Sequence, residues 1–367
     1  MYRRVAEVGL ALTMLVAGCG HSSSASQGPA TSSTPVPSVT TSSTRAASAT
    51  SQAARDLPDP HTLRGLTEVP ELPDPKPVEG SSAQKLPVTV TDVEGNKVTI
   101  KSTSRILALD LYGTLSRTLI GLGLGDKIVG RTVSSTEKQL HDRPVVTENG
   151  HVLNVEAVAG LKPSVIIADR SVGPKEALDQ LRKSGIPVVL VDPHRSVGST
   201  PQLIRTIANA VGKPDAGEAL VKRTQEQINQ AKKQIAAWKP AKPMRVAFLY
   251  VRGNAGVFFI LGSENGASEL IQGVGADDVA SDKGITTLVP ANAESLVSIN
   301  PDAIFVMRDG LASTGGMKGL LARAGVANTT AGRKQRVISI PDGISLSFGP
   351  QTGEVLTAVA KALYGVK

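Results

Sequence analysis

The stretch NVEAVAGLKPSVIIADR, residues 154–170, decides the fold, because NAESLVSINPDAIFVMR at residues 292–308 repeats it. Asparagine, glutamate, proline, isoleucine and arginine coincide, and most of the other differences keep an apolar character. Each copy has the pattern of a short helix, a proline turn and a buried strand. The repeat predicts a duplicated α/β lobe, first at about 103–212 and then at about 243–367.

Further apolar runs alternate with helical patterns along the chain. The strand candidates are RILALD (105–110), VVLVD (188–192), MRVAFLYV (244–251) and AIFVMR (303–308). A helix is expected over LYGTLSRTLIGLGLG, after the first of them, and VTVTDVEGNKVTI (88–100) alternates around a glycine turn as a hairpin does. This alternation favours mainly parallel sheets, so we expect the α/β class with an N-terminal hairpin.

One long helix is predicted between the lobes, bracketed by Pro214 and Pro240. Its apolar stripe at helical spacing consists of Leu220, Ile228, Ala231, Ile235 and Trp238. A helix of roughly 24 residues would be about 36 Å long. Two lobes joined by one rigid helix leave a cleft between them, with only small opening motions.

The N-terminus has the pattern of a bacterial lipoprotein signal. Arg3 and Arg4 precede the apolar run VGLALTMLVAG, which is too short for a membrane span. The run ends in VAGC with the only cysteine of the chain, Cys19, so cleavage before Cys19 and acylation of its thiol are expected. A secretory signal with an unrelated cysteine is the alternative. A single cysteine excludes an intramolecular disulfide, although export implies an oxidising compartment.

The segment after the signal is predicted to be a tether. It is rich in Ser, Thr, Ala, Gln and Pro up to about residue 56 and Pro-rich from Leu57 onward, so the first part cannot bury a core and the second is stiffer. The expected domains are a signal peptide at 1–18, the tether at 19–84, the N-terminal lobe at 85–212, the linking helix at 213–242 and the C-terminal lobe at 243–367.

The charge balance gives little support for nucleic-acid binding. The 40 basic residues exceed the 32 acidic ones, for a formal net charge of +8, but aromatic residues make up only 3%. A nucleic-acid surface would show dense basic runs with interleaved aromatics, and the sequence has none. A basic surface near anionic lipid or wall polymer is the simpler explanation.

The strand ending in FLYVRGN (248–254) carries an unusual pair for a core. Side chains alternate along a strand, so Tyr250 and Arg252 share one face. A neighbouring positive charge and a hydrogen bond both favour the ionised form of a phenol. In the first lobe, His151 stands where the second copy has Val289, so this histidine is not part of the duplicated scaffold. That favours a role for His151 in a site.

Together these features resemble the helical-backbone class of substrate-binding lipoproteins, which serve ABC importers of siderophores, cobalamin and haem. The resemblance covers about residues 85–367. Within the class, ENGHVLNVEAV and FLYVRGN are similar to motifs of the actinobacterial haem receptors HmuT. The resemblance implies ferric haem as the transported ligand, axial iron ligands at His151 and Tyr250, one from each lobe, and an Arg252 that supports the phenolate. Tyr250 follows His151 by 99 residues.

Four further residues are candidates for contacts with haem. Met307 ends a strand and would pack on the porphyrin, or else belong to the core. Arg170 and Arg308 occupy matched positions after the repeat strands and would bind the propionates, unless they are ordinary surface arginines. His194 follows another strand and is a competing iron ligand, because strand ends in such lobes point toward the ligand crevice.

Glu156 and Glu294 are matched across the repeat. In the resembling class one glutamate per lobe docks on arginines of a symmetric permease dimer. A first-turn glutamate favoured by the helix dipole is the alternative. The implied partners are that permease with its ATPase, free haem or a haem-donor surface protein, and the membrane through the lipid anchor. The receptor itself is expected to be a monomer.

The sequence thus predicts an extracytoplasmic haem receptor on the outer face of the cytoplasmic membrane, and not an enzyme. The nearest alternative is a ferric-siderophore or cobalamin receptor of the same class, with Tyr250 and His151 as wall residues. A haem-handling or redox enzyme on this scaffold is a second alternative, and an adhesin with an empty cleft is a third. The sequence shows no convincing dinucleotide loop, nucleophile elbow or metal-cluster spacing.

Overall fold

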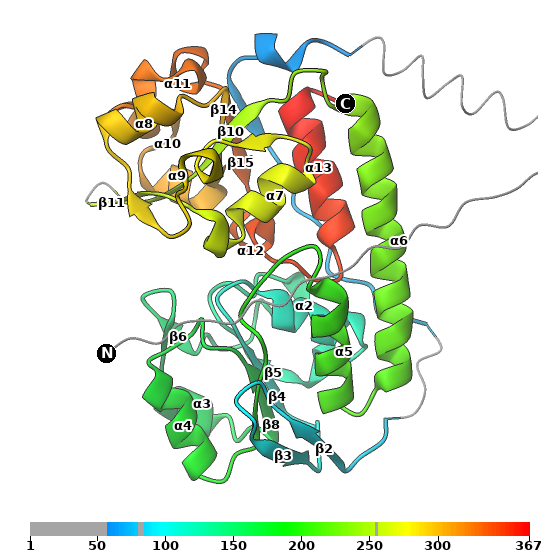
Figure 1. Ribbon diagram of the computed structural model, residues 1–367. Coiled ribbons are helices and arrows are strands. Elements are labelled where there is room, and N and C mark those ends of the chain that lie inside the picture. The colour runs from blue at the N-terminus through cyan, green and yellow to red at the C-terminus, as the bar shows by residue number, and fades with distance from the viewer. Residues whose placement is uncertain (1–56, 80–83, 254–255) are drawn as a thin grey trace, which may run out of the picture. The chain divides into compact units, whose positions relative to one another are not determined.

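A computed structural model describes residues 57–79, 84–253 and 256–367. The predicted signal peptide, Cys19 and the tether up to residue 56 lie outside the described residues. The described chain forms two α/β lobes (Figure 1), and the predicted fold class is confirmed. Within these ranges no helix has the length and apolarity needed to cross a membrane.

The first lobe is built on a four-stranded parallel sheet in the order β5-β4-β8-β9. Its strands are β4 (Ile106–Leu109), β5 (Ile128–Gly130), β8 (Val165–Ala168) and β9 (Val188–Leu190). Two antiparallel hairpins accompany it, β2 (Val88–Thr91) with β3 (Lys97–Ile100) and β6 (Thr147–Glu148) with β7 (Val152–Leu153). Its helices are α2 (Thr114–Gly121), α3 (Val155–Gly160), α4 (Lys175–Lys183) and α5 (Thr200–Ala210). Every residue of β4, β8 and β9 is buried, as expected for a parallel sheet covered on both faces.

The second lobe has a larger sheet in the order β1-β15-β14-β10-β11-β13, with β12 also paired to β10. Its strands are β1 (Leu66–Glu68), β10 (Arg245–Arg252), β11 (Val257–Ile260), β12 (Asp277–Asp278), β13 (Val289–Pro290), β14 (Ala303–Met307) and β15 (Val337–Ile340). The antiparallel members are β11 and β13, and the other pairs are parallel. Its helices are α7 (Ala267–Gly273), α8 (Ala293–Ile299), α9 (Arg308–Ser313), α10 (Gly316–Leu321), α11 (Thr330–Lys334), α12 (Asp342–Ser345) and α13 (Thr352–Tyr364).

A shared topology accounts for the sequence repeat. In each lobe a short helix, α3 or α8, leads into a strand that pairs in parallel with the first core strand, β8 with β4 and β14 with β10. The coinciding asparagines begin these helices. The side chain of Asn154 accepts a hydrogen bond from the backbone N–H of Ala157, and that of Asn292 accepts one from Ser295. Such N-caps satisfy backbone donors that the first turn leaves unpaired.

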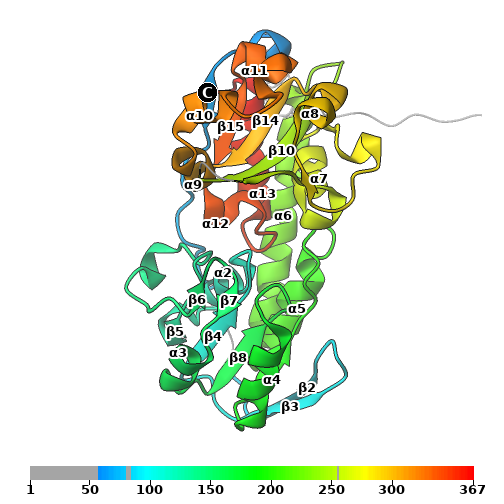
Figure 2. The ribbon, with the colours of Figure 1, turned by 90° about the vertical axis from the view of Figure 1, so that its left-hand side faces the viewer.

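The long helix α6 (Pro214–Trp238) has 25 residues and passes along both lobes (Figures 1 and 2). It packs against α5 of the first lobe and α13 of the second. Its apolar stripe divides between the two cores: Leu220 belongs to the first-lobe core, and Ala231 and Ile235 belong to the second-lobe core. The apolar stripe of α6 therefore packs into the cores of both lobes.

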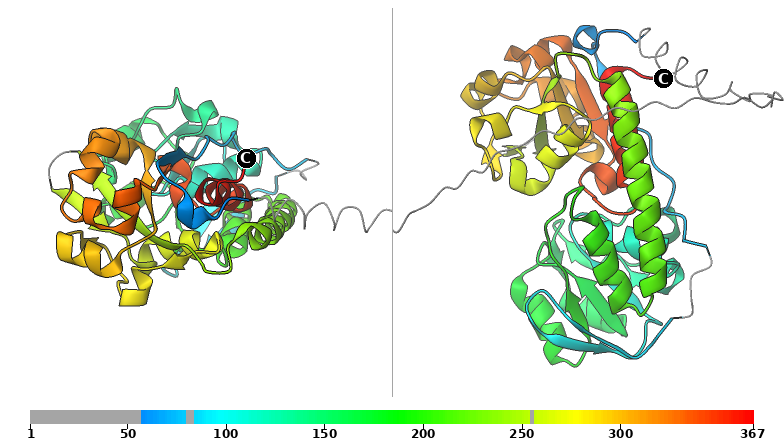
Figure 3. Two further views of the ribbon diagram at one scale, coloured as in Figure 1. Left: turned by 90° about the horizontal axis from the view of Figure 1, so that it is seen from above. Right: turned by 45° about the vertical axis from the view of Figure 1, so that its right-hand side comes forward.

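Residues 57–79 depart from the tether that the sequence predicts, because they are folded. In this segment β1 extends the second-lobe sheet by pairing with β15. Val69 is fully buried in the second-lobe core, and Val78 packs on the first-lobe core. Residues 66–78, called the strap below, thus contact both lobes (Figure 3).

Hydrogen bonds also fix the strap between Val69 and Val78. The carboxylate of Asp74 accepts hydrogen bonds from the backbone N–H groups of Lys138 and Gln139 in the first lobe, at 2.8 and 2.9 Å. Arg223 of α6 donates to the carbonyl of Lys76 at 2.6 Å. Prolines exclude a helix here, which gives the composition of a linker, but they leave the carbonyl groups free to accept such bonds.

Candidate functional site

A cavity of about 400 Å³ lies between the lobes. The first lobe contributes Leu111, Tyr112, Val133, Ser134, Thr136 and Gly150, and the second contributes Tyr250, Arg252, Leu261, Asn265, Leu288, Met307, Asp309, Asp342, Ser345 and Leu346. Three of these, Leu111, Val133 and Leu288, are large apolar side chains that stay exposed. Exposed apolar side chains gathered around a cavity from two lobes indicate a binding site with apolar character.

Tyr250 and Arg252 lie at the cavity end of β10, on the face that the strand alternation predicts. The guanidinium carbon of Arg252 lies 5.1 Å from the centroid of the Tyr250 ring. The same guanidinium donates to Asp342 Oδ1 at 2.5 Å and lies 3.4 Å from the sulfur of Met307. Met307 therefore lines the cavity as expected, and it contacts the arginine that stacks on the tyrosine.

The position of Arg252 is set by residues of α9 and α12. Asp342 is itself held by the backbone N–H of Asp309, which donates to Oδ2 at 2.8 Å. Burial raises the pKa of Asp342, while this hydrogen bond and the charge of Arg252 lower it. A Cβ on Gly310 would lie 2.3 Å from Nη1 of Arg252, so only glycine leaves room for the guanidinium.

His151 lies in the turn between β6 and β7, directly after Gly150, which lines the cavity. Its side chain is exposed. Gly150 has a φ of 87°, in the left-handed region that glycine adopts without strain. His151 itself is not among the described residues that line the cavity, although its neighbour Gly150 is.

Three of the four predicted haem-contact residues, Arg170, Arg308 and His194, are not among the described residues that line the cavity. Arg170 turns to Glu94 and Asp179, with donor–acceptor distances of 2.8 to 3.0 Å. Arg308 binds Glu71 and the carbonyl of Val69 on the strap. Both arginines follow repeat strands, but nearby carboxylates and a carbonyl bind their guanidinium groups.

The third residue is His194, and its ring nitrogen lies 2.8 Å from Asp192 Oδ1. Its side chain is largely exposed, and it is absent from the described cavity lining. A short turn after β9 folds the histidine back on its own loop. What distinguishes the two exposed histidines is that His194 already has a carboxylate partner, and that Gly150, next to His151, lines the cavity.

Sequence reasoning missed Tyr112 and the buried group beside it. Tyr112 lines the cavity from the first lobe, and the guanidinium carbon of Arg195 lies 5.5 Å from its ring centroid. Arg195 in turn contacts the buried carboxylates of Asp110 and Asp169. The sequence pattern that could have identified these residues is the presence of charged or phenolic residues just after predicted parallel strands, in ALDLY, IIADR and VDPHR.

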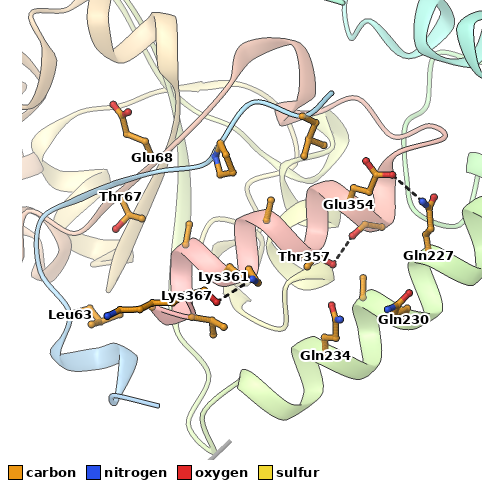
Figure 4. Close-up of a pocket in the computed structure, with 18 of the residues that line it drawn as sticks. Leu63, Thr67, Glu68, Gln227, Gln230, Gln234, Glu354, Thr357, Lys361 and Lys367 are labelled. Atoms are coloured by element: carbon orange, nitrogen blue, oxygen red, sulfur yellow. Dashed lines mark hydrogen bonds between the residues drawn. The ribbon is translucent and has the colours of Figure 1, made fainter. Parts of the chain in front are cut away.

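A second cavity of about 790 Å³ lies between the strap, α6 and α13. Figure 4 shows its polar lining, in which the amide of Gln227 donates to Glu354 at 2.9 Å. None of the described residues that line it is His, Tyr, Cys or Met. Across the described chain, no three His, Cys, Asp or Glu side chains gather as a site for a bare metal ion. The cavity between the lobes is therefore the candidate site.

Glu156 and Glu294 lie in the first turns of α3 and α8, and both side chains are exposed. They follow the capping asparagines by two residues in each lobe. The duplicated topology therefore presents one exposed carboxylate per lobe at equivalent positions.

Two lobes, a single connecting helix and a cavity between them define a binding protein rather than a globular domain with a closed core. The chain belongs to the periplasmic binding protein family, whose model matches residues 111–343. A curated relative, the uncharacterized ABC transporter substrate-binding lipoprotein YvrC of Bacillus subtilis (strain 168), is 27% identical over 280 residues, which are 76% of this chain and 86% of YvrC. The cobalamin-binding protein of Halobacterium salinarum is 24% identical over 80% of this chain and 78% of its own length.

Among solved structures, the haem-binding protein HmuT is 49% identical to this chain, with a TM-score of 0.82 over 84% of this chain and 100% of HmuT. Its structures include variants in which a histidine, a tyrosine or an arginine is replaced by alanine. That tyrosine follows the histidine by 99 residues, and the arginine follows the tyrosine by two. The same intervals separate His151, Tyr250 and Arg252 in this chain.

Proposed function

We propose that this protein is the haem receptor of an ABC importer and that its cavity holds one ferric haem between His151 and Tyr250. The observation that carries the proposal is the position of Arg252 over the ring of Tyr250 in an apolar cavity between two lobes. The 49% identity to HmuT over all of that protein supports the same ligand.

The chemistry of the two side chains suits ferric haem. A tyrosinate is a hard anionic donor that stabilises Fe(III), and a neutral imidazole completes the opposite face. The ordinary pKa of tyrosine is about 10, so the phenol needs help to ionise at neutral pH. The iron would supply most of that help and Arg252 the rest. Two axial ligands leave no open iron position, which argues against peroxide or O₂ chemistry on this scaffold.

Ligands from separate lobes provide a route for release. Glu156 and Glu294 would dock on arginines of the permease dimer, one from each lobe. If docking spreads the lobes, one iron bond must lengthen and the haem loosens. The receptor would act as a monomer, with residues 85–212 and 243–367 as its lobes, and Cys19 would carry the lipid that holds it on the outer face of the membrane.

Cobalamin is the second candidate, because the Halobacterium relative binds it. Cobalamin carries a corrin ring and a nucleotide loop and is larger than haem. A cavity of about 400 Å³ lies toward the lower end of the range of about 300–1,000 Å³ for ligand sites. A wider opening of the lobes would be needed for cobalamin, and Tyr250 would then be a wall residue. The same applies to a ferric siderophore, whose iron is already saturated.

The test is an absorption titration of the purified protein with hemin, cyanocobalamin and a ferric siderophore. The variants are Tyr250→Phe and His151→Ala, beside His141→Ala as a matched control, since His141 is an exposed histidine of the same lobe. We expect saturation at one hemin per chain, a changed iron spectrum in the first two variants and a wild-type spectrum in the control. A spectrum equal to free hemin, with saturable binding of cobalamin or siderophore, would refute the proposal.

A further inference from the structure

A buried arginine of the first lobe, Arg117 of α2, donates hydrogen bonds to the second lobe. Its Nη1 donates to Oε1 of Gln351 at 2.7 Å, and its Nε donates to the backbone carbonyl of Gly343 at 3.3 Å. Its charged partner in the first lobe is Glu137, whose Oε1 lies 3.5 Å from Nε. Both side chains of this ion pair are buried. The two shortest hydrogen bonds of the guanidinium therefore cross between the lobes.

The lobes are in close contact at this point. Gly343 belongs to α12 of the second lobe, and a Cβ on it would overlap Oγ1 of Thr136 in the first lobe. Nη2 of Arg117 lies 3.5 Å from the same hydroxyl oxygen. Gln351 extends the contact to the strap, because its Nε2 donates to the carbonyl of Pro73 at 2.9 Å. The backbone of α12 therefore packs directly on the first lobe, and only glycine fits at the point of contact.

The same short helix holds the arginine of the proposed iron site. Asp342 precedes Gly343 in α12, and its Oδ1 accepts a hydrogen bond from Arg252 at 2.5 Å. Arg252 in turn lies over the ring of Tyr250. Because α12 has only four residues and no side-chain cap at its N-terminus, it has little stability of its own, and its position depends on its contacts. The contact with the first lobe is one residue away from the carboxylate that holds Arg252.

We propose that Arg117 is a positioning residue for the Tyr250–Arg252 pair of the opposite lobe. By binding α12 from the first lobe it keeps Asp342, and with it Arg252, in place while the lobes are together. When the lobes separate, the hydrogen bonds of Arg117 across the interface break, α12 loses this support, and the guanidinium of Arg252 moves off the ring. The inference rests on the proposed function, in which Tyr250 binds the iron. Opening of the lobes then weakens the tyrosine ligand as well as lengthening the distance between the two ligands.

The main test variant is Arg117→Met/Glu137→Gln, which replaces the buried ion pair by neutral groups of similar size. Loss of one charge alone would leave the other buried and unpaired, whereas neutral replacement of a whole buried pair is often tolerated. The matched control is Arg182→Met/Asp92→Asn, an ion pair at 2.9 Å whose salt bridges in the described chain stay within the first lobe. A second variant, Gly343→Ala, keeps every charge and pushes α12 away from the first lobe by its added Cβ.

The first measurement needs no haem. Nuclear magnetic resonance of the purified protein follows the Nε–Hε signal of Arg252, which is assigned by its loss in Arg252→Ala. We expect this signal to shift or broaden in Arg117→Met/Glu137→Gln and in Gly343→Ala, because Asp342 no longer fixes the guanidinium. The signal should stay unchanged in the control. An unchanged signal in both test variants would overturn the inference, and Gly343→Ala decides alone if the double variant does not fold.

The second measurement is the rate constant of haem loss from the hemin-loaded protein to apomyoglobin. It should rise by about 5-fold or more in Arg117→Met/Glu137→Gln, which is a modest value for coupling between two sites. In an Arg252→Ala background the same double variant should raise it by a smaller factor, because the residue through which Arg117 acts is already gone. An unchanged rate constant, or equal factors in the two backgrounds, would contradict the inference. A wild type that binds no hemin refutes the proposed function instead, and the Arg252 signal of the ligand-free protein still decides the role of Arg117.

Discussion

Arg252 lies over the ring of Tyr250, with 5.1 Å between the guanidinium carbon and the ring centroid, and is held there by Asp342. The pair has two uses in the proposed iron site. A positive charge beside a phenol favours a metal-bound phenolate, and the ion pair with Asp342 holds the guanidinium beside the ring. The arrangement is local to β10, α9 and α12, so it can be perturbed without unfolding either lobe.

Replacing Arg252 by alanine should weaken haem binding and leave the fold intact. A partly buried cation beside an aromatic ring contributes about 1–2 kcal/mol, which corresponds to about 5- to 30-fold in affinity. Hemin titration measures the change. Arg323→Ala is the control, because Arg323 stacks on Phe258 of the same lobe, with 5.6 Å between its guanidinium carbon and the ring centroid, and lines no part of the cavity. Equal losses in the two variants would show that the effect is structural.

Gly310→Ala should act on haem binding in the same direction as Arg252→Ala, although it removes no charge. The added Cβ would lie 2.3 Å from Nη1 of Arg252 and 2.6 Å from the carbonyl oxygen of Val251, so the guanidinium must move. Gly160→Ala is the matched control, since a Cβ there meets nothing within 4 Å. Unchanged affinity in Gly310→Ala would mean that the position of Arg252 over the ring has no part in binding.

The buried carboxyl group of Asp110 should make the free energy of unfolding depend on pH. The pKa of Asp110 is raised from 3.8 to about 7, so the folded protein binds a proton that the unfolded chain has already lost. This contribution is present below about pH 4 and is lost as the pH rises through about 7, at a slope of at most about 1.4 kcal/mol per pH unit.

Chemical unfolding of wild type and Asp110→Asn between about pH 5 and about pH 8 checks this dependence. The difference in unfolding free energy between the two proteins should change in favour of Asp110→Asn as the pH rises. Parallel curves for the two proteins over this range would rule out a proton held by Asp110.

Asp74→Ala should release the first-lobe end of the strap. Its carboxylate accepts two backbone N–H groups at the start of a short helical turn, and losing such a cap costs about 1 kcal/mol. We expect a lower unfolding free energy and faster haem transfer to apomyoglobin, measured by stopped flow. Glu71→Gln is the control, because Glu71 lies on the strap but binds only Arg308 of the second lobe. Equal rates of haem transfer in the two variants would show that the first-lobe end of the strap does not help to retain the ligand.

Much of the fold could be predicted, because the spacing of apolar residues along the sequence indicates which side chains are buried. The repeat at 154–170 and 292–308 and the stripe from Leu220 to Trp238 define lobes, sheets and the connecting helix by pattern alone. The strap could not be predicted, since its prolines have the composition of a linker while Val69 and Val78 anchor it through contacts far apart in sequence. Single anchoring residues of this kind produce no periodic pattern of apolar residues in the local sequence.

The site was predictable to the level of strand ends and no further. Tyr250 and Arg252 follow from strand alternation and Met307 from its place at the end of a strand, and all three line the cavity. Arg170 and Arg308 also stand at strand ends, but their direction depends on Glu94 and Glu71, which come from segments that the strand pattern does not relate to them. The direction of a side chain at a strand end depends on the residues that surround it. Which residues these are is known only once the fold is known.

The strap and α6 have a joint mechanical consequence. The chain passes between the lobes twice, once as a proline-stiffened segment and once as a helix of 25 residues. Two crossings that are both stiff leave the lobes one easy rotation, about the line that joins the crossings, and oppose twisting about any other. Opening then has a single coordinate, so one distance between a probe on each lobe is enough to follow the cavity through a whole transport cycle.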